Sequence, residues 1–368
     1  MEKEKKPIRI AQILGKLMAG GVEMVVFNYY RAIDKSKFQF DFFYDADSIV
    51  DPPQDLIEMG ARFYKVPPYQ QLNSYLKELN KFFNENKYII VHSHINTLSV
   101  FPLYEAWKCG VPIRIAHNHS VPSGKEFKRN FLKYLLRCFS KTFSTNYFAC
   151  SEKAGRWMFG DKLFEQGNVI VIKNAVNFNV FLFDYSKNEM LKKDLQLQNR
   201  IVIGHVGRFT YAKNHKFLIE LFKDIHKKIP NSLLLLVGDG ELNQEIHDLV
   251  KKFNLSESVV FVGKVSNPEN YYPLMDVVVL PSIFEGLSMT TIESQIAGVP
   301  IVTSLAVPEE AVISDGCKRL SLDDPEWVNT IIDCIDKKVV LNDKSEEYNI
   351  EKAVKKLEKL YTNFIESK

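Results

Sequence analysis

The 368-residue sequence lacks the features that mark several specialised classes of protein. Its five cysteines are scattered, odd in number and without a Cys-x-x-Cys pair, so we predict reduced thiols rather than disulfides or a zinc site. No apolar run approaches 18 residues, and the run after the charged N-terminus is too short for a signal sequence. We therefore predict a cytoplasmic protein without a membrane span. A net charge of +3 is too small to indicate binding to nucleic acid.

The sequence does contain two series of short, Val- and Ile-rich runs that alternate with helical spacings. A polar, lysine-rich stretch at residues 186–200 separates the two series. The alternation predicts the α/β class, with two doubly wound domains at residues 1–185 and 186–345. A last amphipathic helix is predicted within residues 346–368.

The most informative stretch is residues 276–300. Residues 277–280 are predicted as a buried strand, because the run is apolar, rich in Val and too short for a helix. A tight turn follows at Glu285 and Gly286, where glycine lets the backbone come close to a ligand. A helix is predicted from about Ser288. A helix N-terminus aimed at such a turn forms an anion-binding site.

Two acidic residues of this stretch, Glu285 and Glu293, are candidate ligand contacts. Eight steps along a helix would place them roughly 12 Å apart. That separation is too large for the carboxylate pair of a retaining glycosidase, which needs about 5–5.5 Å. It suits contacts with the two ends of a long ligand. The alternative, that Glu285 is a turn residue and Glu293 an exposed helix residue, stays open on spacing alone.

Cationic and glycine-rich loops follow predicted strands in both halves of the chain. Arg208 and Lys213 lie in a strand-to-helix loop, where two cations can converge on one diphosphate. Gly20 and Gly21 lie between a predicted strand and a helix, an arrangement that can cradle phosphate. The alternatives are surface cations in the first loop and a tight turn without a ligand in the second.

Two His-x-His pairs end neighbouring predicted strands, His92 with His94 and His117 with His119. Residues i and i+2 of a strand share a face, so each pair could offer two imidazoles to a metal. No carboxylate ligands for a hydrolytic metal site are evident nearby in the sequence. The carboxyl ends of strands are where open α/β sheets bind ligands. Polar residues that merely cap the sheet are the alternative.

Residues 125–141 form the one strongly charged segment, with six basic residues and one acidic residue. Apolar residues occur between them at helical spacing. A basic amphipathic helix can lie on an anionic membrane surface, so we predict a peripheral membrane contact here. The alternative is that the apolar stripe packs in the core.

The segment FEGLSMTTIESQIAGVPIV, residues 284–302, resembles the E-x7-E signature of retaining glycosyltransferases of family 4. The resemblance covers nearly the whole chain and is closest to transferases of bacterial capsule and exopolysaccharide clusters. It implies the GT-B fold, two Rossmann-like doubly wound domains that face each other across a cleft. The final helix would then cross back onto the first domain. One departure is Ser294, where a small Ala commonly follows the second Glu.

The resemblance assigns roles to the candidate residues. It implies that Glu285 contacts hydroxyls of the donor sugar and that Glu293 holds the ribose of the nucleotide. Arg208 and Lys213 match a G-R and K-N pattern that neutralises the leaving diphosphate. The remaining implied contacts with the donor are Gly20, Gly21, Gly286, Leu287 and Ser288.

The resemblance also covers the end of the N-terminal half. His119 matches a histidine that faces the reacting sugar and the leaving phosphate, with His117 nearby. Asn174 and Val176 match a further Asn-Gly-Val motif, in which Ala175 replaces the glycine. If that position required a positive φ, alanine would cost about 1 kcal/mol.

We therefore predict a transferase that moves a sugar from a nucleotide-sugar, expected to be a UDP-sugar, to a glycan or lipid-linked acceptor of a bacterial surface polysaccharide. The predicted catalytic residues are Glu285, His119, Arg208 and Lys213. No metal is expected, because cationic side chains would stabilise the leaving diphosphate. Asp45-Ala46-Asp47, which resembles the metal motif of a different transferase architecture, is interpreted as a polar loop.

Three other functions stay open. A sugar-nucleotide epimerase of the same fold would use the same donor. A binding protein would keep the nucleotide site and transfer nothing. A metal hydrolase would use the histidine pairs.

Overall fold

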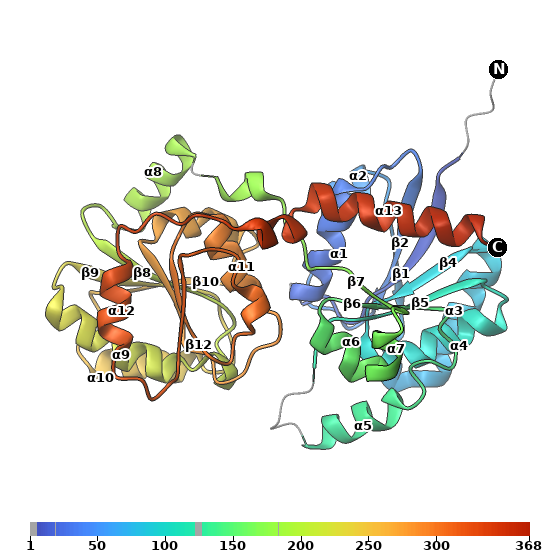
Figure 1. Ribbon diagram of the computed structural model, residues 1–368, viewed down its shortest axis with the longest axis horizontal. Coiled ribbons are helices and arrows are strands. Elements are labelled where there is room, and N and C mark those ends of the chain that lie inside the picture. Colours follow the sequence, from blue (N-terminus) through green and yellow to red (C-terminus); the bar gives the residue numbers. More distant parts are fainter. Residues whose placement is uncertain (1–5, 19, 122–126, 183) are drawn as a thin grey trace. The chain divides into compact units, whose positions relative to one another are not determined.

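The computed structural model describes residues 6–18, 20–121, 127–182 and 184–368. Two α/β units make up the chain (Figure 1). The first unit comprises residues 1–176 and 347–368, and the second comprises residues 177–346.

The first crossing between the units lies at residue 176, earlier than the predicted boundary at residue 185. The reason is that the connecting residues pack on the second unit. The ring of Phe181, in the short helix η3 (Phe178–Phe181), lies 5.9 Å from the ring of Tyr272. Asn188, in α8 (Tyr185–Asp194), donates to the carbonyl of Asn270 at 3.1 Å. These contacts hold the connecting residues on the second unit.

The first unit is built on a seven-stranded sheet in the order β3-β2-β1-β4-β5-β6-β7. Every neighbouring pair is parallel. The strands are β1 (Ile8–Ile13), β2 (Phe38–Asp45), β3 (Arg62–Val66), β4 (Ile90–Ser93), β5 (Ile113–Asn118), β6 (Asn146–Ala149) and β7 (Val169–Val171). The strand order reverses between β1 and β4, which is the switch point at which doubly wound sheets bind ligands.

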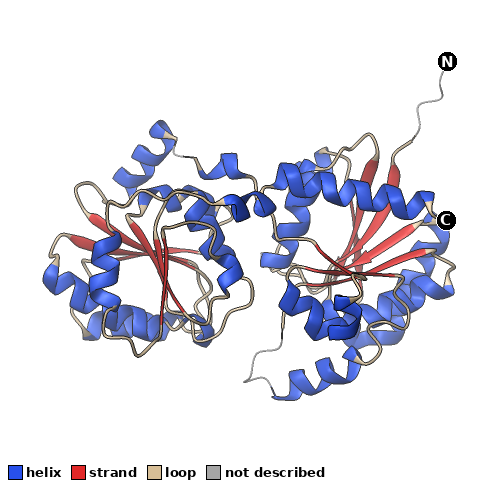
Figure 2. Cartoon of the chain, viewed as in Figure 1, coloured by secondary structure: helices blue, strands red, loops and turns tan. Residues whose placement is uncertain are grey.

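Helices cover both faces of this sheet (Figure 2). One face packs against α1 (Gly21–Ala32), α2 (Gln54–Glu58) and the C-terminal helix α13 (Ile350–Glu366). The other packs against α3 (Leu72–Asn86), α4 (Val100–Lys108), α6 (Glu152–Phe159) and α7 (Asp161–Glu165). Successive strand residues point to opposite faces, so Phe42 joins the first layer and Phe43 the second. Both layers are apolar, which explains why all of β2 is buried.

The second unit contains a six-stranded parallel sheet in the order β10-β9-β8-β11-β12-β13. The strands are β8 (Ile201–Val206), β9 (Ser232–Val237), β10 (Val259–Gly263), β11 (Val277–Leu280), β12 (Ile301–Ser304) and β13 (Cys317–Leu320). Its helices are α9 (His215–Lys228), α10 (Asn243–Lys252), α11 (Met289–Ile296) and α12 (Trp327–Cys334). The strand predicted at residues 277–280 is confirmed as β11, fully buried at the centre of the sheet. Its switch point lies between β8 and β11.

The loops after β8 and β9 pack backbone against backbone. Gly238 has a φ of +142°, and a Cβ there would lie 2.0 Å from the carbonyl oxygen of Gly207. A Cβ on Gly240 would lie 2.4 Å from the carbonyl oxygen of Phe209. The amide of Phe209 donates to Asp239 at 3.0 Å. The two glycines therefore allow the close approach that holds the loop carrying Arg208.

We predict that Gly238→Ala lowers the free energy of unfolding by at least about 2 kcal/mol, because φ is strained and the nearest atom is backbone. Gly286→Ala is the matched control, since a Cβ there would meet no atom within 4 Å. It should change stability by less than about 0.5 kcal/mol. Urea unfolding of both variants measures the difference. Equal stability of the two would contradict the close loop packing.

Candidate functional site

The N-terminus of α11 lies at the switch point of the second sheet. Ser288 caps this helix: its Oγ accepts the amide N–H of Thr291 at 3.3 Å and the Thr291 hydroxyl at 2.9 Å. The first turn of a helix has unsatisfied N–H groups that attract anions. The space beside Gly286 is open, and its φ is not positive. The predicted turn and helix start are thus present, with room beside them for a ligand.

An ion pair joins the loops that follow the two central strands. Lys213, in η4 (Tyr211–Lys213) after β8, lies 2.5 Å from Oε1 of Glu285, in the loop after β11. The same Glu285 oxygen accepts the hydroxyl of Ser282 at 2.8 Å. Only 18% and 11% of the Lys213 and Glu285 side chains are exposed, so the pair is largely removed from solvent. Two residues 72 positions apart in sequence therefore meet.

Arg208, the other predicted diphosphate ligand, lies outside this pair. Its side chain is 63% exposed and lies 3.5 Å from the carboxylate of Glu241, which is also exposed. A surface pair of this kind contributes at most about 1 kcal/mol. An anionic ligand could therefore take Arg208 from Glu241 at little cost.

Glu293 lies inside α11 and accepts a hydrogen bond from the hydroxyl of Tyr272 at 2.7 Å. Burial raises the pKa of Glu293, and the hydrogen bond from Tyr272 opposes that shift. Tyr272 is fully buried. Sequence reasoning missed Tyr272, because no spacing relates it to a helix residue 21 positions later.

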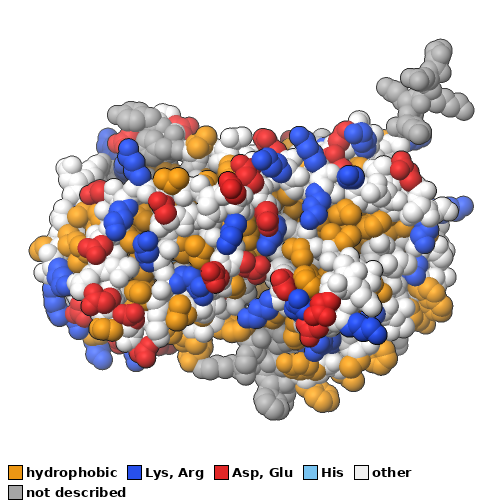
Figure 3. Space-filling view, viewed as in Figure 1, with side chains coloured by type: hydrophobic (Ala, Val, Ile, Leu, Met, Phe, Trp, Pro, Cys, Tyr) orange, Lys and Arg blue, Asp and Glu red, His pale blue; other side chains and the backbone are white. Residues whose placement is uncertain are grey.

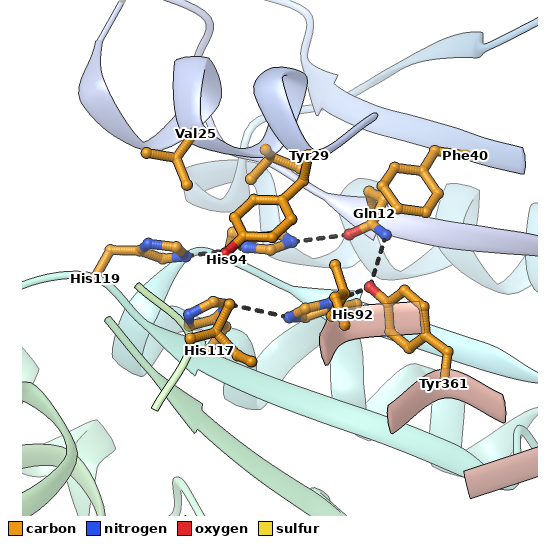
Figure 4. A pocket seen from close by; sticks show the side chains of 12 residues that line it. Gln12, Val25, Tyr29, Phe40, His92, His94, His117, His119 and Tyr361 are labelled. Carbon is orange, nitrogen blue, oxygen red and sulfur yellow. Dashed lines mark hydrogen bonds between the residues drawn. The ribbon is translucent and has the colours of Figure 1, made fainter. Parts of the chain in front are cut away.

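The four histidines of the His-x-His pairs form one buried cluster in the first unit (Figure 4). His92 and His117 lie near the carboxyl ends of β4 and β5, and His94 and His119 follow those strands. β4 is next to β1 at the switch point, and β5 is next to β4. Nε2 of His92 lies 3.1 Å from Nδ1 of His117, and Nδ1 of His94 lies 3.0 Å from Nε2 of His119. With Gln12 they line a cavity of about 20 Å³.

Two residues that sequence reasoning missed complete this cluster. Gln12, the last residue but one of β1, is fully buried, and its Oε1 lies 2.8 Å from Nε2 of His94. The hydroxyl of Tyr361, in α13, lies 2.7 Å from Nδ1 of His92. A polar residue inside an apolar strand was the available signal for Gln12. Tyr361 gave none, because a tyrosine on an apolar helix face is ordinary core.

Burial lowers the pKa of all four histidines, that of His119 to about 4, so the cluster is neutral at pH 7. Nitrogens of His92, His94 and His117 lie within 4.8 Å of one another, close enough to share a metal ion. That group contains no carboxylate. The cluster could therefore bind a polar ligand through neutral imidazoles or hold a metal through them.

Comparison with known proteins decides the family. A model described as "Glycosyltransferase Family 4" matches residues 19–180, and one described as "Glycosyl transferases group 1" matches residues 186–356. The Bacillus subtilis (strain 168) protein named "Putative glycosyltransferase EpsF" is 31% identical over 88% of this chain and 86% of its own. The chain belongs to glycosyltransferase family 4.

Further similarities support this placement of the glycosyltransferase. An Escherichia coli protein named UDP-Gal:alpha-D-GlcNAc-diphosphoundecaprenol alpha-1,3-galactosyltransferase is 24% identical over the whole of both chains. Among solved structures, Anabaena HepE in complex with UDP-glucose has a TM-score of 0.77 at 18% identity, covering 97% of this chain and all of that one. The predicted GT-B fold and family are thereby confirmed.

The structure also shows the glycine turn, Ala175 and the Asp-x-Asp segment of this glycosyltransferase. A carboxylate oxygen of Glu23 accepts the amide N–H groups of Met18, at 2.5 Å, and Gly20, at 2.8 Å, so an anionic group already occupies the glycine turn. Ala175 is buried and does not have a positive φ, so the expected cost of replacing glycine does not arise. Asp47 forms an exposed pair with Lys16 at 2.9 Å, as suits a polar loop, but Asp45 is the buried last residue of β2.

The predicted basic helix is α5 (Phe127–Arg137), which ends before residue 141. Residues 125 and 126 lie outside the described residues, and the side chains of residues 127–130 are not described. Of the side chains that follow, Phe131 is 72% exposed, and Tyr134 and Leu135 are also exposed. These three side chains therefore do not pack in the core, whereas Leu136 of the same helix is buried. In the described part of the chain, no helix combines the length and apolar character needed to cross a bilayer.

We predict that stability falls when pH is lowered from 7 to 5. The four clustered histidines and the buried His205 and His215 have folded-state pKa values below the unfolded value of about 6.5. The unfolded chain therefore binds more protons below pH 6.5, which costs up to ~1.4 kcal/mol per pH unit for each histidine.

Carboxyl groups with raised pKa values oppose this effect, above all Asp45, whose pKa burial raises to about 6. Asp45→Asn should accordingly steepen the decline of stability with falling pH. Urea unfolding midpoints at pH 7, 6 and 5 give the measurement. A midpoint that is constant or higher at pH 5 would show that the histidines are protonated in the folded protein.

Proposed function

We propose that this glycosyltransferase is a retaining, metal-independent hexosyltransferase, which uses a UDP-sugar and a glycan or lipid-linked acceptor of a bacterial surface polysaccharide. The observation that carries the proposal is the Lys213–Glu285 pair beside the capped N-terminus of α11. The names of the Escherichia coli relative and of the Anabaena complex support the UDP-sugar, and the former supports a lipid-linked acceptor.

The leaving diphosphate requires stabilisation as the bond from its oxygen to the sugar breaks. Lys213 lies within reach of the loop after β11 and would supply one cation. Arg208 would supply a second cation after it separates from Glu241. The N–H groups at the N-terminus of α11 would form a third positive site. These three groups would stabilise the charge of the diphosphate, as a metal ion does in other transferases, so no metal ion would be required.

The described residues at this place offer no free carboxylate as a covalent nucleophile, so retention, which the family resemblance implies, would require attack on the face that the phosphate leaves. One Glu285 oxygen accepts hydrogen bonds from Lys213 and Ser282, which lowers its nucleophilicity and suits contacts with the hydroxyls of the donor sugar. We propose that the acceptor oxygen attacks the anomeric carbon from the side that the phosphate leaves. The acceptor proton would pass to the leaving phosphate oxygen. His119 would contact the reacting sugar, as a neutral group.

The other donor contacts follow the same geometry. Glu293, held by Tyr272, would accept hydroxyl groups of the ribose. Gly286, Leu287 and Ser288 would line the donor at the start of α11. A diphosphate at Gly20 and Gly21 would first have to displace the carboxylate of Glu23.

We predict that Glu285→Gln lowers kcat by at least about 100-fold and changes the dissociation constant of UDP little. Glu293→Gln should instead weaken UDP binding by roughly 10- to 100-fold, the equivalent of one charge-assisted hydrogen bond. Titration calorimetry with UDP and release of UDP from UDP-sugars measure the two effects. Glu257→Gln, which alters an exposed carboxylate of the same unit, is the control.

Equal affinity for UDP in the wild type and Glu293→Gln would contradict this division of roles. Conversion of one UDP-sugar into another without an acceptor would show that the enzyme is an epimerase rather than a transferase. Loss of activity with a chelator, restored by Mg²⁺ or Mn²⁺, would contradict metal independence.

We also propose that α5 rests on an anionic membrane surface near the lipid-linked acceptor. Except for Leu136, its described apolar side chains are exposed, and hydrophobic side chains gather in the corresponding part of the surface (Figure 3). Basic residues in the same segment would add about 1 kcal/mol each near such a surface. The enzyme would then act at the inner face of the cell membrane.

We predict that Phe131→Ser with Leu135→Ser lowers partitioning onto phosphatidylglycerol vesicles by at least about tenfold, because each buried side chain contributes about 1.5–3 kcal/mol. Met190→Ser is the control, since Met190 is 62% exposed in α8, on the second unit. Co-sedimentation with vesicles measures the partitioning. Binding that is the same in the wild type and the double variant would assign the exposed stripe to another contact.

A further inference from the structure

The histidine cluster is one continuous chain of hydrogen bonds, drawn as dashed lines in Figure 4. From one end to the other it contains His119, His94, Gln12, Tyr361, His92 and His117. The central link is the amide Nε2 of Gln12, which donates to the hydroxyl oxygen of Tyr361 at 3.3 Å. Every member is buried, so water does not compete for these bonds.

The amide of Gln12 determines which nitrogen of His94 and His119 carries a hydrogen. Its oxygen can only accept, so His94 must donate to it from Nε2. A neutral imidazole has one N–H, so Nδ1 of His94 is an acceptor. His119 must then donate from Nε2, which leaves its Nδ1 as a lone pair.

The other half of the chain is determined in the same way. The Tyr361 oxygen accepts from Gln12, and its own hydrogen has Nδ1 of His92 as acceptor. His92 therefore carries its hydrogen on Nε2 and donates to Nδ1 of His117. His117, in turn, carries its hydrogen on Nε2. All four histidines are thus the same Nε2–H tautomer.

The two ends of the chain lie side by side and have no partners. The rings of His117 and His119 are 4.0 Å apart between centroids. Among the described residues, Nε2 of His117 and Nδ1 of His119 are buried polar atoms without a hydrogen-bond partner. The first is a donor and the second an acceptor. Oδ1 of Asn174 has no partner in this arrangement among the described residues, and it lies close enough to His119 to accept a hydrogen from it in the other tautomer.

One donor beside one acceptor matches a hydroxyl group, which needs both. We propose that Gln12 and Tyr361 are positioning residues that fix the tautomers of His117 and His119 so that the pair binds one hydroxyl of a sugar. The identity of that hydroxyl as part of a sugar rests on the proposed function. The assignment of the tautomers does not rest on the proposed function.

Rotation of the Gln12 amide by 180° would reverse every donation in the chain. His119 would then carry its hydrogen on Nδ1, where Asn174 could accept it, and Nε2 of His117 would become an acceptor, so the pair would lose its free donor. The Tyr361 hydroxyl would have to turn at the same time, so that it donates to Gln12 and accepts from Nδ1 of His92, and it thereby couples the two halves of the chain. A positioning role therefore extends to a helix that is far from the histidines in sequence.

The test is ¹⁵N NMR of the full-length protein with ¹⁵N-labelled histidine, in which protonated and unprotonated ring nitrogens give separate signals. We expect His92, His94, His117 and His119 to carry hydrogen only on Nε2 at pH 7.5. His205 is an internal reference with the opposite tautomer, because its Nδ1 donates to the carbonyl of Val279 at 2.9 Å. An Nδ1–H signal from His119 in the wild type would overturn the proposal.

Tyr361→Phe removes one hydroxyl and keeps the ring, which packs against Phe38 at 5.7 Å. We expect His94 and His119 in this variant to become mixtures of the two tautomers. Tyr75→Phe is the matched control, because Tyr75 is also buried in the first unit and its hydroxyl has no partner among the described residues. Tautomers that are unchanged in Tyr361→Phe would overturn the role of Tyr361.

Gln12→Met gives a second, independent test if Tyr361→Phe does not fold, since it removes both amide contacts with little change of shape. It should produce the same mixture at His94 and His119, and a single tautomer in it would overturn the role of Gln12. Zn²⁺ that shifts the signals of His92, His94 and His117 together in the wild type would also overturn the proposal, in favour of a metal site.

Kinetics separates this proposal from the proposed function. We expect Tyr361→Phe to lower kcat about tenfold, with the KM for the donor changed less than twofold and the unfolding midpoint similar to that of Tyr75→Phe. The NMR result stands even if the protein transfers no sugar, whereas an active enzyme with unchanged tautomers would refute only the positioning role. A fall in kcat that accompanies an equal loss of stability would make Tyr361 merely structural.

Discussion

Parallel strand pairing is the constraint on which both candidate sites depend. It brings the carboxyl ends of all strands to one edge of each sheet, so residues from distant loops meet there. In the first unit that edge carries the histidines at the ends of β4 and β5, next to β1. In the second it carries Lys213 and Glu285 after β8 and β11. Each group lies where the order of its strands reverses.

The two edges differ in their electrostatics. The first holds neutral imidazoles, because burial makes the charged forms unfavourable. The second holds a pair of opposite charges, a carboxyl group on α11 and a capped helix N-terminus. Neutral donors and acceptors suit hydroxyl groups, and fixed positive charge suits phosphate.

Much of this could be predicted from local sequence. The four-residue apolar run of β11, the turn at Gly286 and the cap at Ser288 are short-range features, and each occurs where the pattern indicates. Strand-end positions also placed the histidine pairs correctly at the sheet edge. The predicted boundary at residue 185 differs from the division of the structure at residue 176, because a polar composition does not reveal that Phe181 packs on the second unit.

The sequence by itself therefore determined the family, the alternation of elements and the edge at which each candidate residue lies, since these depend on neighbours in the chain. Only the tertiary structure decided which residues touch. Lys213 meets Glu285 across 72 positions, and Gln12 meets Tyr361 across 349. No local pattern encodes such pairs, because they arise from the packing of strands and of α13 against β1 and β4. The same packing decides the hydrogen positions on the histidines, and these set what the cavity can bind.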